Sequence, residues 1–91
     1  MECDWDESKD AANRAKHGVS LAQAVRLDWD NGQTRPDTRV DYGEDRTEVL
    51  AMLDGRLHVC IFTMRDKVLR VISLRKANPR EERRYEQVRS K

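Results

Sequence analysis

The sequence predicts a single α+β domain over residues 1–91, with two N-terminal helices, a three- to four-stranded, mainly antiparallel sheet and one C-terminal helix. A chain of 91 residues has room for one hydrophobic core only. Its apolar residues are concentrated between residues 49 and 74, in β-branched runs separated by two-residue turn signals. Helix start and stop signals bracket the segments on either side of these runs.

Two short helices are expected at the N-terminus. The first is expected from about residue 6 to 17, because Asp6 is a suitable N-cap and Gly18 follows a basic pair at the other end. The second is expected from Ser20, which can cap it, to about Asp28, because its apolar residues recur at helical spacing.

The middle of the chain is expected to form a loop and then strands. Residues 28–45 are polar and rich in turn signals, so they are expected to hold at most one short edge strand near residues 34–40. Asp54-Gly55 and Asp66-Lys67 then read as tight turns between three strands at residues 47–53, 56–64 and 68–75. Asn78 and Pro79 begin a last helix that runs to about Val88.

Two-residue turns would fix which side chains share a face of the sheet. One face would carry Leu50, Met52, Leu57, Val59, Ile61, Ile72 and Leu74, with Arg46, Glu48, Thr63, Arg65 and Arg70 at one end. The other would carry Val49, Ala51, Leu53, Cys60, Phe62, Leu69 and Val71, with His58, Ser73 and Arg75 at the opposite end. A three-residue second turn would instead place Arg65 with Ser73 and Arg75. Since three short helices cover only one face readily, an apolar patch is expected to stay partly exposed.

The charge is unevenly distributed. Residues 1–64 hold 8 Lys and Arg against 13 Asp and Glu, whereas residues 65–91 hold 10 against 4. A basic segment attracts a polyanion such as RNA or an acidic protein, although a charged helix is more often a solvated face. The thiols Cys3 and Cys60 fit no metal motif, and no signal peptide or apolar run of membrane length occurs, so a cytoplasmic location without metal or cofactor is expected.

Four sequence blocks stand in an order and at a spacing that are together specific. They are residues 5–9, 13–20, 41–46 and 70–77, the last followed by Glu82 and Tyr85. Over almost the whole chain these blocks resemble the BrnT family of type II toxins. Two departures are mild: Leu74 stands where a small residue or Met is common, and Asp66-Lys67 lacks the usual glycine.

The resemblance implies a RelE-like fold and an endoribonuclease activity that arrests translation. It also implies neutralisation by a BrnA-type antitoxin with a ribbon-helix-helix DNA-binding domain. Toxin and antitoxin would form a hetero-oligomer that represses its own operon, so this chain would meet operator DNA only through the antitoxin. The exposed apolar patch would be covered by the antitoxin or by self-association.

Cleavage of RNA through its own 2′-hydroxyl needs a base, cations around the phosphate and a proton donor, but no metal. The candidate phosphate clamps are Arg75, Arg65 and Arg46, because a planar guanidinium can hold two phosphate oxygens. Candidates for proton transfer are Glu82, Tyr85 and His17, with Lys16 as an alternative cation, and candidates for substrate binding are Arg70, Ser73 and Lys76.

Each candidate has a structural alternative. Lys16 and His17 could only complement the helix dipole, Arg70 could form a surface ion pair, and Glu82 could pair with an arginine of its own helix. Arg75 is the strongest candidate, since it stands at the end of a strand before the basic tail.

Two other classes of function are compatible with the sequence. A non-catalytic binding module would form a tight complex with an acidic partner but would not cleave RNA. A gyrase-directed toxin on the same type of fold would stop DNA synthesis rather than protein synthesis.

Overall fold

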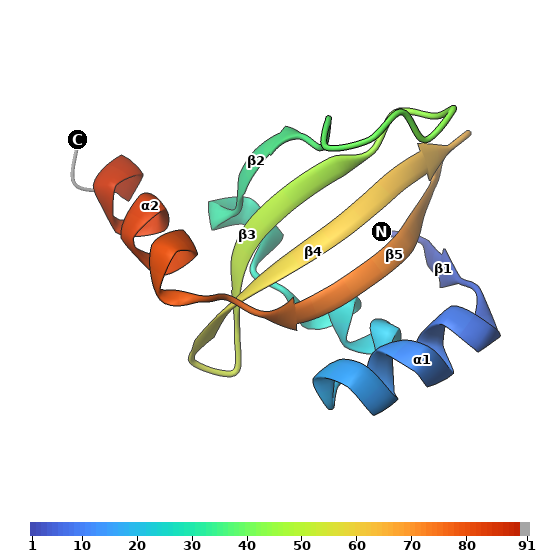
Figure 1. Cartoon of the computed structure of the whole chain (residues 1–91), viewed down its shortest axis with the longest axis horizontal. Helices are drawn as coiled ribbons and strands as arrows, with labels where there is room; N and C mark the ends of the chain where they lie inside the picture. The colour runs from blue at the N-terminus through green and yellow to red at the C-terminus, as the bar shows by residue number, and fades with distance from the viewer. Residues whose placement is uncertain (90–91) are drawn as a thin grey trace.

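The computed structural model, which describes residues 1–89, contains one five-stranded mixed sheet (Figure 1). Its strands are β1 (Cys3–Trp5), β2 (Gln33–Pro36), β3 (Thr47–Leu53), β4 (Arg56–Arg65) and β5 (Val68–Lys76). The order across the sheet is β1-β5-β4-β3-β2, with β1 parallel to β5 and all other neighbours antiparallel. The α+β class and the three central strands are therefore confirmed.

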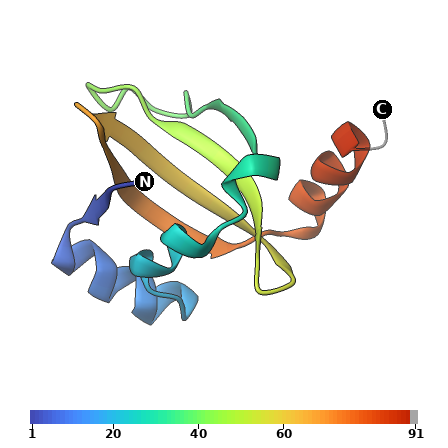
Figure 2. The same ribbon diagram turned by 180° about the vertical axis from the view of Figure 1, so that it is seen from behind.

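Helical segments lie on one face of the sheet and at one of its ends. They are α1 (Glu7–His17), the 3₁₀ helices η1 (Leu21–Arg26) and η2 (Trp29–Asn31), and α2 (Pro79–Arg89). Helix α1 and η1 pack against β5 on what we call the α1 face, which is turned toward the viewer in Figure 2. Helix α2 leaves the end of β5 and projects beyond the sheet, where it packs on the opposite face (Figure 1).

The first helix forms as its end signals predict. The Asp6 carboxylate accepts hydrogen bonds from the backbone amides of Ser8 and Lys9 at 2.9 and 3.1 Å. At the other end Gly18 adopts φ 72°, a left-handed conformation in which its amide reaches the Arg14 carbonyl.

The prediction of a second α-helix from Ser20 to about Asp28 is wrong in the type of helix and in its length. Ser20 does cap it, but the segment is a 3₁₀ helix that ends at Arg26, because Leu27 is extended and turns into the core. The indole of Trp29 then donates to the Ala24 carbonyl at 2.9 Å, which holds the chain in a sharp turn and starts the unpredicted η2.

Both edges of the sheet differ from expectation. Strand β1 was not predicted, because three residues carry no periodicity and a parallel pairing with β5 joins segments far apart in the sequence. Strand β2 ends at Pro36 rather than near residue 40, since the amide of Asp37 turns to the Arg46 carbonyl at 2.8 Å.

A β-bulge overturns the predicted division of side chains between the faces. Both turns have two residues as expected, with Leu53 opposite Arg56 and Arg65 opposite Val68. Ile61 pairs with Ser73 but Phe62 pairs with Val71, so β5 carries one extra residue. Every side chain of β5 after the bulge therefore lies on the face opposite to the one that the sequence predicted.

The bulge moves Leu74 into the core of the α1 face and turns Ser73 and Arg75 to the opposite face. Arg65 thus shares a face with Ser73 and Arg75, as the three-residue turn would have required, although the cause is the bulge.

Two apolar clusters fill the faces of the sheet. The one under α1 and η1 contains Leu21, Ala24, Leu27, Val49, Ala51, Leu53, Cys60, Leu69, Val71 and Leu74. The other contains Leu50, Leu57, Val59, Ile61, Ala77 and Tyr85. Leu50, Val59 and Ile61 are at most 5% exposed, so the prediction of a partly exposed apolar patch is wrong. Among residues 1–89 the exposed large apolar side chains are scattered: Met1, Val25, Val40, Met64 and Val88.

The last helix forms as predicted and runs one residue further, to Arg89. The Asn78 side chain accepts from the amide of Glu81 at 2.8 Å, and the Glu81 carboxylate accepts from the amide of Asn78 at 2.9 Å. Cys60 and His58 are buried in the sheet, and burial raises the pKa of the Cys60 thiol to about 12. No helix within residues 1–89 is long and apolar enough to span a membrane.

Candidate functional site

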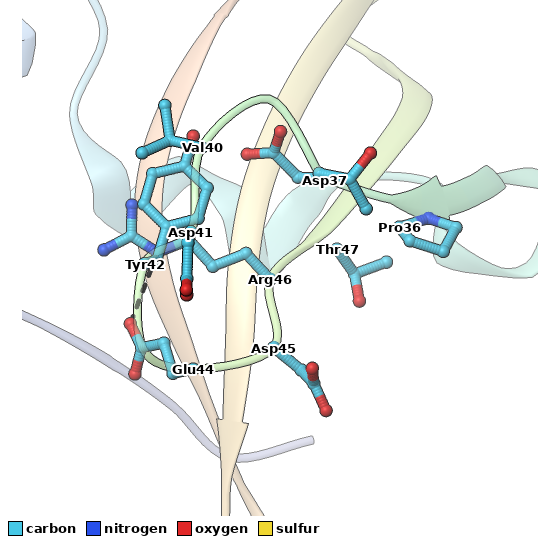
Figure 3. Close-up of a pocket in the computed structure, with 10 residues that line it drawn as sticks. Pro36, Asp37, Val40, Asp41, Tyr42, Glu44, Asp45, Arg46 and Thr47 are labelled. Atoms are coloured by element: carbon cyan, nitrogen blue, oxygen red, sulfur yellow. Dashed lines mark hydrogen bonds and ion pairs between the residues drawn. The ribbon is translucent and has the colours of Figure 1, made fainter.

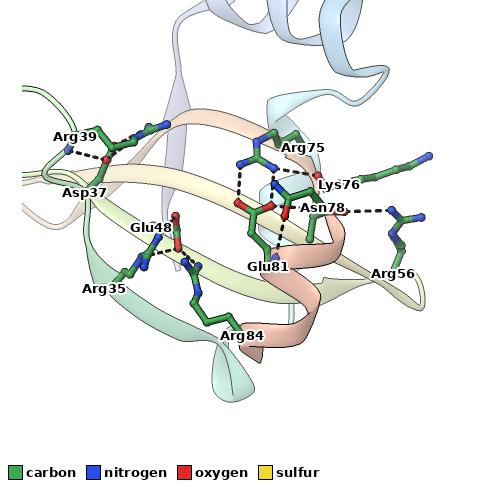
Figure 4. Close-up of polar contacts among 11 residues, drawn as sticks. Arg35, Asp37, Arg39, Glu48, Arg56, Arg75, Lys76, Asn78, Glu81 and Arg84 are labelled. Carbon is green, nitrogen blue, oxygen red and sulfur yellow. Dashed lines mark hydrogen bonds and ion pairs between the residues drawn. The ribbon is translucent and has the colours of Figure 1, made fainter. Parts of the chain in front are cut away.

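A network of arginines and carboxylates covers the sheet face opposite α1 (Figure 4). We call it the arginine cluster, and its members are Arg35, Arg39, Arg75 and Arg84 with Asp37, Glu48 and Glu81. They come from β2, the loop after it, β3, β5 and α2. Four guanidinium groups against three carboxylates leave this surface with an excess of positive charge.

Arg75 joins β5 to the start of α2. Its two terminal nitrogens each donate to one oxygen of Glu81 at 2.8 Å, which is a bidentate pair. The same carboxylate is held by the first turn of α2 through the amide of Asn78. Hydrogen bonding to Glu81 raises the pKa of Arg75, and the Arg75 guanidinium lowers the pKa of Glu81. The strand and the helix thus fix the direction of one guanidinium.

Glu48 and Asp37 organise the other three arginines. Glu48 is buried and accepts from Arg35, which stands opposite it on β2, at 3.1 Å, and also from Arg84 of α2. Asp37 is buried too, and hydrogen bonds from Arg39 at 2.7 and 2.9 Å lower its pKa.

A second pair of arginines lies at the far end of the same face. Arg46 and Arg65 share Glu44, each at 3.3 Å, and the guanidinium of Arg46 lies 4.0 Å from the centre of the Tyr42 ring. The loop around them borders a cavity of about 590 Å³ (Figure 3).

The structure does not bring the three predicted phosphate clamps together. Val59, the partner of Arg75, is six residues from Arg65 along β4, which corresponds to about 20 Å in a strand. The pair at Glu44 therefore cannot touch the same phosphate as Arg75.

Two predicted substrate-binding residues lie on the face of the arginine cluster. Arg70 forms an ion pair with Asp4 of β1 at 3.3 Å, as its structural alternative supposed. Ser73 is half-buried, lies beside Ile61 and precedes Arg75 by two residues on the same face.

The predicted proton-transfer residues are dispersed. Tyr85 is only 4% exposed and packs in the apolar cluster, where its carbonyl accepts from Gln33. Glu82 lies 3.8 Å from Arg56 of β4, so a pair within its own helix is not what the structure shows.

His17 ends α1, beside the exposed Lys16. Desolvation lowers the pKa of His17, and the charges of Lys16 and Arg75 lower it further. Lys76 is exposed and follows Arg75 on the other face of the strand.

Six residues of the arginine cluster were not predicted as site residues: Arg35, Arg39, Arg84, Asp37, Glu48 and Glu81. The spacing of Asn78 and Glu81 matches a reciprocal helix cap, and this signal could have fixed the position of Glu81. Arg35, Glu48 and Arg84 meet through the way β2 and α2 lie against β3, which no local pattern in the sequence specifies. Asp37 and Arg39 pair with each other in the loop after β2.

The arrangement is suited to hold a polyanion. Guanidinium groups that carboxylates already orient can exchange a carboxylate oxygen for a phosphate oxygen with little loss of side-chain entropy. Phosphodiesters of a nucleic acid strand are ligands of this kind.

One comparison with known proteins bears on this surface. The model of a family described as "Ribonuclease toxin, BrnT, of type II toxin-antitoxin system" matches residues 5–81. The matched segment runs from the end of β1 to the first turn of α2 and includes Arg75 and Glu81. No curated protein matches the chain.

Proposed function

Because the chain belongs to the BrnT family of ribonuclease toxins of type II toxin-antitoxin systems, we propose that it is a metal-independent endoribonuclease that arrests translation. The observation that carries this proposal is the arginine cluster, in which Arg75 is oriented by a carboxylate that α2 holds in place. The substrate would be RNA lying across the sheet face opposite α1.

Arg75 is proposed to stabilise the charge that develops on the scissile phosphate. The 2′-hydroxyl oxygen would attack the adjacent phosphorus, the bond to the 5′-oxygen would break, and a 2′,3′-cyclic phosphate would form. The leaving 5′-oxygen would take up a proton from water and become a 5′-hydroxyl. The phosphate oxygens would replace one or both Glu81 oxygens on the guanidinium, which already points out of the sheet (Figure 4). Such a preorganised charge acts mainly in the transition state.

His17 is the proposed base that accepts the proton of the 2′-hydroxyl. It follows Asn13 by four residues on α1, and the Asn13 side chain donates to the Leu74 carbonyl at 2.8 Å. Residues four apart share a helix side, so His17 lies near the end of β5, where the charge of Arg75 influences its pKa. Tyr85 and Glu82 are less favoured, since one is buried and the other faces Arg56.

The remaining cations would contact RNA away from the scissile bond. Arg46 and Arg65 share one carboxylate and so retain positive charge, which suits a phosphate further along the strand. Arg70, Ser73 and Lys16 would line the path between these contacts.

Cleavage in vitro tests the activity directly. The purified chain, incubated with end-labelled RNA in excess EDTA, should produce fragments that end in a 2′,3′-cyclic phosphate and a 5′-hydroxyl. Tight binding without cleavage would identify a non-catalytic module. In cells, induction should stop incorporation of labelled amino acids before that of labelled thymidine, whereas the reverse order would identify a gyrase-directed toxin.

The proposed partner is a BrnA-like ribbon-helix-helix antitoxin that forms a hetero-oligomer with this chain and links it to operator DNA. Co-expression with the product of the adjacent gene should yield a stable complex without RNA cleavage. A chain that purifies free of that product and stays active in its presence would contradict this part of the proposal.

A further inference from the structure

A cavity lies behind the arginine cluster, on the α1 face at the end of β5. It has a volume of about 530 Å³ and lies between the chain around Gly18 to Arg26 and the turn that joins β3 to β4. Arg56, His58 and Lys76 form its strand side. We call it the hairpin cavity. Its volume falls within the range of about 300 to 1,000 Å³ that is usual for ligand pockets.

The hairpin cavity carries positive charge that the described residues do not neutralise. Arg26 is paired with Asp54, but Lys76 enters no ion pair with any residue among 1–89. Arg56 forms an ion pair with Glu82 at 3.8 Å, which is longer than a hydrogen bond, and both side chains are about half-exposed. Two cations therefore face this cavity with room for an anion.

The position of Arg56 is supported from two directions. Its guanidinium donates to the Ala77 carbonyl at 3.3 Å. The Nδ1 of His58 lies 2.8 Å from the Arg56 carbonyl, and since a carbonyl only accepts, this nitrogen carries the proton. The hairpin end is thus tied both to the start of α2 and to a buried ring.

Lys76 connects the hairpin cavity with the arginine cluster. It follows Arg75 directly, and consecutive side chains of a strand point to opposite faces. In Figure 4 the side chain of Lys76 extends away from the pair of Arg75 and Glu81, and Arg56 lies on the same side as Lys76. Beyond Lys76 the strand ends, so a ligand can pass from one face to the other around this end, beside Gly18, which follows α1.

We propose that the hairpin cavity binds a phosphodiester of the same RNA strand, next to the one held at Arg75. The identification of the ligand as RNA rests on the function proposed above. The anion site itself rests on Lys76, which enters no ion pair among residues 1–89, and on Arg56, whose ion pair with Glu82 is long and half-exposed. RNA would then cross the end of β5, with the scissile phosphate on one face and a flanking phosphate on the other.

The test uses RNA that cannot be cleaved, so that binding is measured apart from catalysis. A fluorescently labelled 2′-O-methyl hexanucleotide is titrated with the full chain and with a double variant, Arg56→Ala with Lys76→Ala. The double variant should bind about tenfold more weakly, and its salt dependence should be smaller by roughly one phosphate contact. A 2′-O-methyl dinucleotide, too short to span both faces, should bind equally to both proteins.

A charge-matched control is the double variant Lys9→Ala with Arg83→Ala. Both side chains are exposed and enter no ion pair among residues 1–89, so the net charge falls equally while the cavity stays intact. This control should bind the hexanucleotide like the wild type. All these positions are exposed, so thermal midpoints should change little.

Some results of this binding test would contradict the cavity proposal alone, and one would also contradict the proposed function. Equal weakening by both double variants, or none by either, would overturn the cavity proposal while leaving the proposed function standing. Unchanged RNA affinity with weaker binding of a poly-glutamate peptide would assign the cavity to an acidic protein and overturn the proposal as well. A wild-type chain that binds no RNA would overturn both proposals.

Discussion

Arg75 pairs with a carboxylate that the backbone also holds. The carboxylate of Glu81 is fixed by the Asn78 amide as well as by Arg75, so neither group of the pair moves freely. Glu44, in contrast, is shared by two arginines at 3.3 Å without comparable backbone support. Local geometry therefore favours Arg75 as the cation with a defined direction.

The pair of Arg75 and Glu81 should make stability depend on pH. Because Arg75 lowers the pKa of Glu81 below its ordinary 4.5, the folded chain binds this proton less readily than the unfolded chain. The stabilisation is present above pH 4.5 and is lost as the pH falls through the lowered value. Glu81→Gln should reduce the thermal midpoint at pH 7 by more than it does at pH 3.

Glu86→Gln provides the control, since Glu86 is exposed on the same helix and, within residues 1–89, pairs only with Arg89. Its midpoint should follow that of the wild type at both pH values. Equal shifts for Glu81→Gln at pH 7 and pH 3 would show that the carboxylate charge does not stabilise the fold.

His17 should govern the acidic side of the pH-rate profile. A base must be unprotonated, and desolvation with the charges of Lys16 and Arg75 lowers the pKa of His17 below 6.5. The rate of RNA cleavage should therefore be level near pH 7 and fall only below the lowered pKa. His17→Gln should reduce the rate about a hundredfold or more and remove this acidic fall. An acidic fall that persists in His17→Gln would exclude His17 as the base.

At the scale of the elements, Asn13 of α1 completes the open edge of β5. Its side-chain amide donates to the Leu74 carbonyl at 2.8 Å and to the Val19 carbonyl at 2.8 Å, and it accepts from the Leu74 amide at 3.2 Å. It thus replaces a neighbouring strand where β1 has already ended.

Asn13→Ala should lower the free energy of unfolding by about 2 kcal/mol, because it leaves buried backbone groups without partners. Urea denaturation monitored by circular dichroism measures the change. Asn31→Ala, which removes an exposed contact with Asp28, should shift the midpoint little. Equal effects of the two substitutions would mean that Asn13 does not support the edge.

The elements that the sequence predicts are those with local signals. The predicted signals include two helix caps, Asp6 and Asn78, whose side chains accept hydrogen bonds from backbone amides. They also include Gly18 and the turn at Asp54-Gly55, where the backbone has a positive φ. The bulge in β5 has no such signal, since it depends on how β4 and β5 pack as a pair.

The site residues could likewise be predicted only where a local signal in the sequence places them. Arg75 could be predicted as a strand-end cation, but its face depended on the bulge and its partner on the start of α2. Arg35 and Glu48 meet only through the pairing of β2 with β3, and β2 is four residues long. The predicted site therefore combined Arg75 and Arg65, which the structure separates by about 20 Å.

At the scale of the whole molecule, α2 and the charged side chains cover the second face of the sheet. Tyr85 is the buried anchor of α2, while Glu81 and Arg84 join the helix to β5 and β3. The face that supports the proposed RNA site is thus also the face that α2 closes.

Tyr85→Ala should therefore disturb both stability and activity. Loss of a buried aromatic ring from a core typically lowers the free energy of unfolding by about 3 kcal/mol or more, which is about 10 to 20 °C in a domain of this size. Tyr85→Phe keeps the ring and should retain the thermal midpoint. It should also retain cleavage if His17, not Tyr85, transfers the proton. A stable but inactive Tyr85→Phe protein would instead support Tyr85 as a proton donor.

The central claim is that Arg75 acts on the phosphate rather than only joining β5 to α2. The measurement is the rate of RNA cleavage per folded molecule, well below the thermal midpoint, for Arg75→Ala, Arg75→Lys and the exposed control Arg83→Ala. Arg75→Ala should be slower by about a hundred- to thousandfold, and Arg75→Lys should recover little of the rate because it lacks the bidentate fork. Arg83→Ala should cleave like the wild type. An Arg75→Ala protein that is less stable but cleaves at the wild-type rate per folded molecule would contradict the claim.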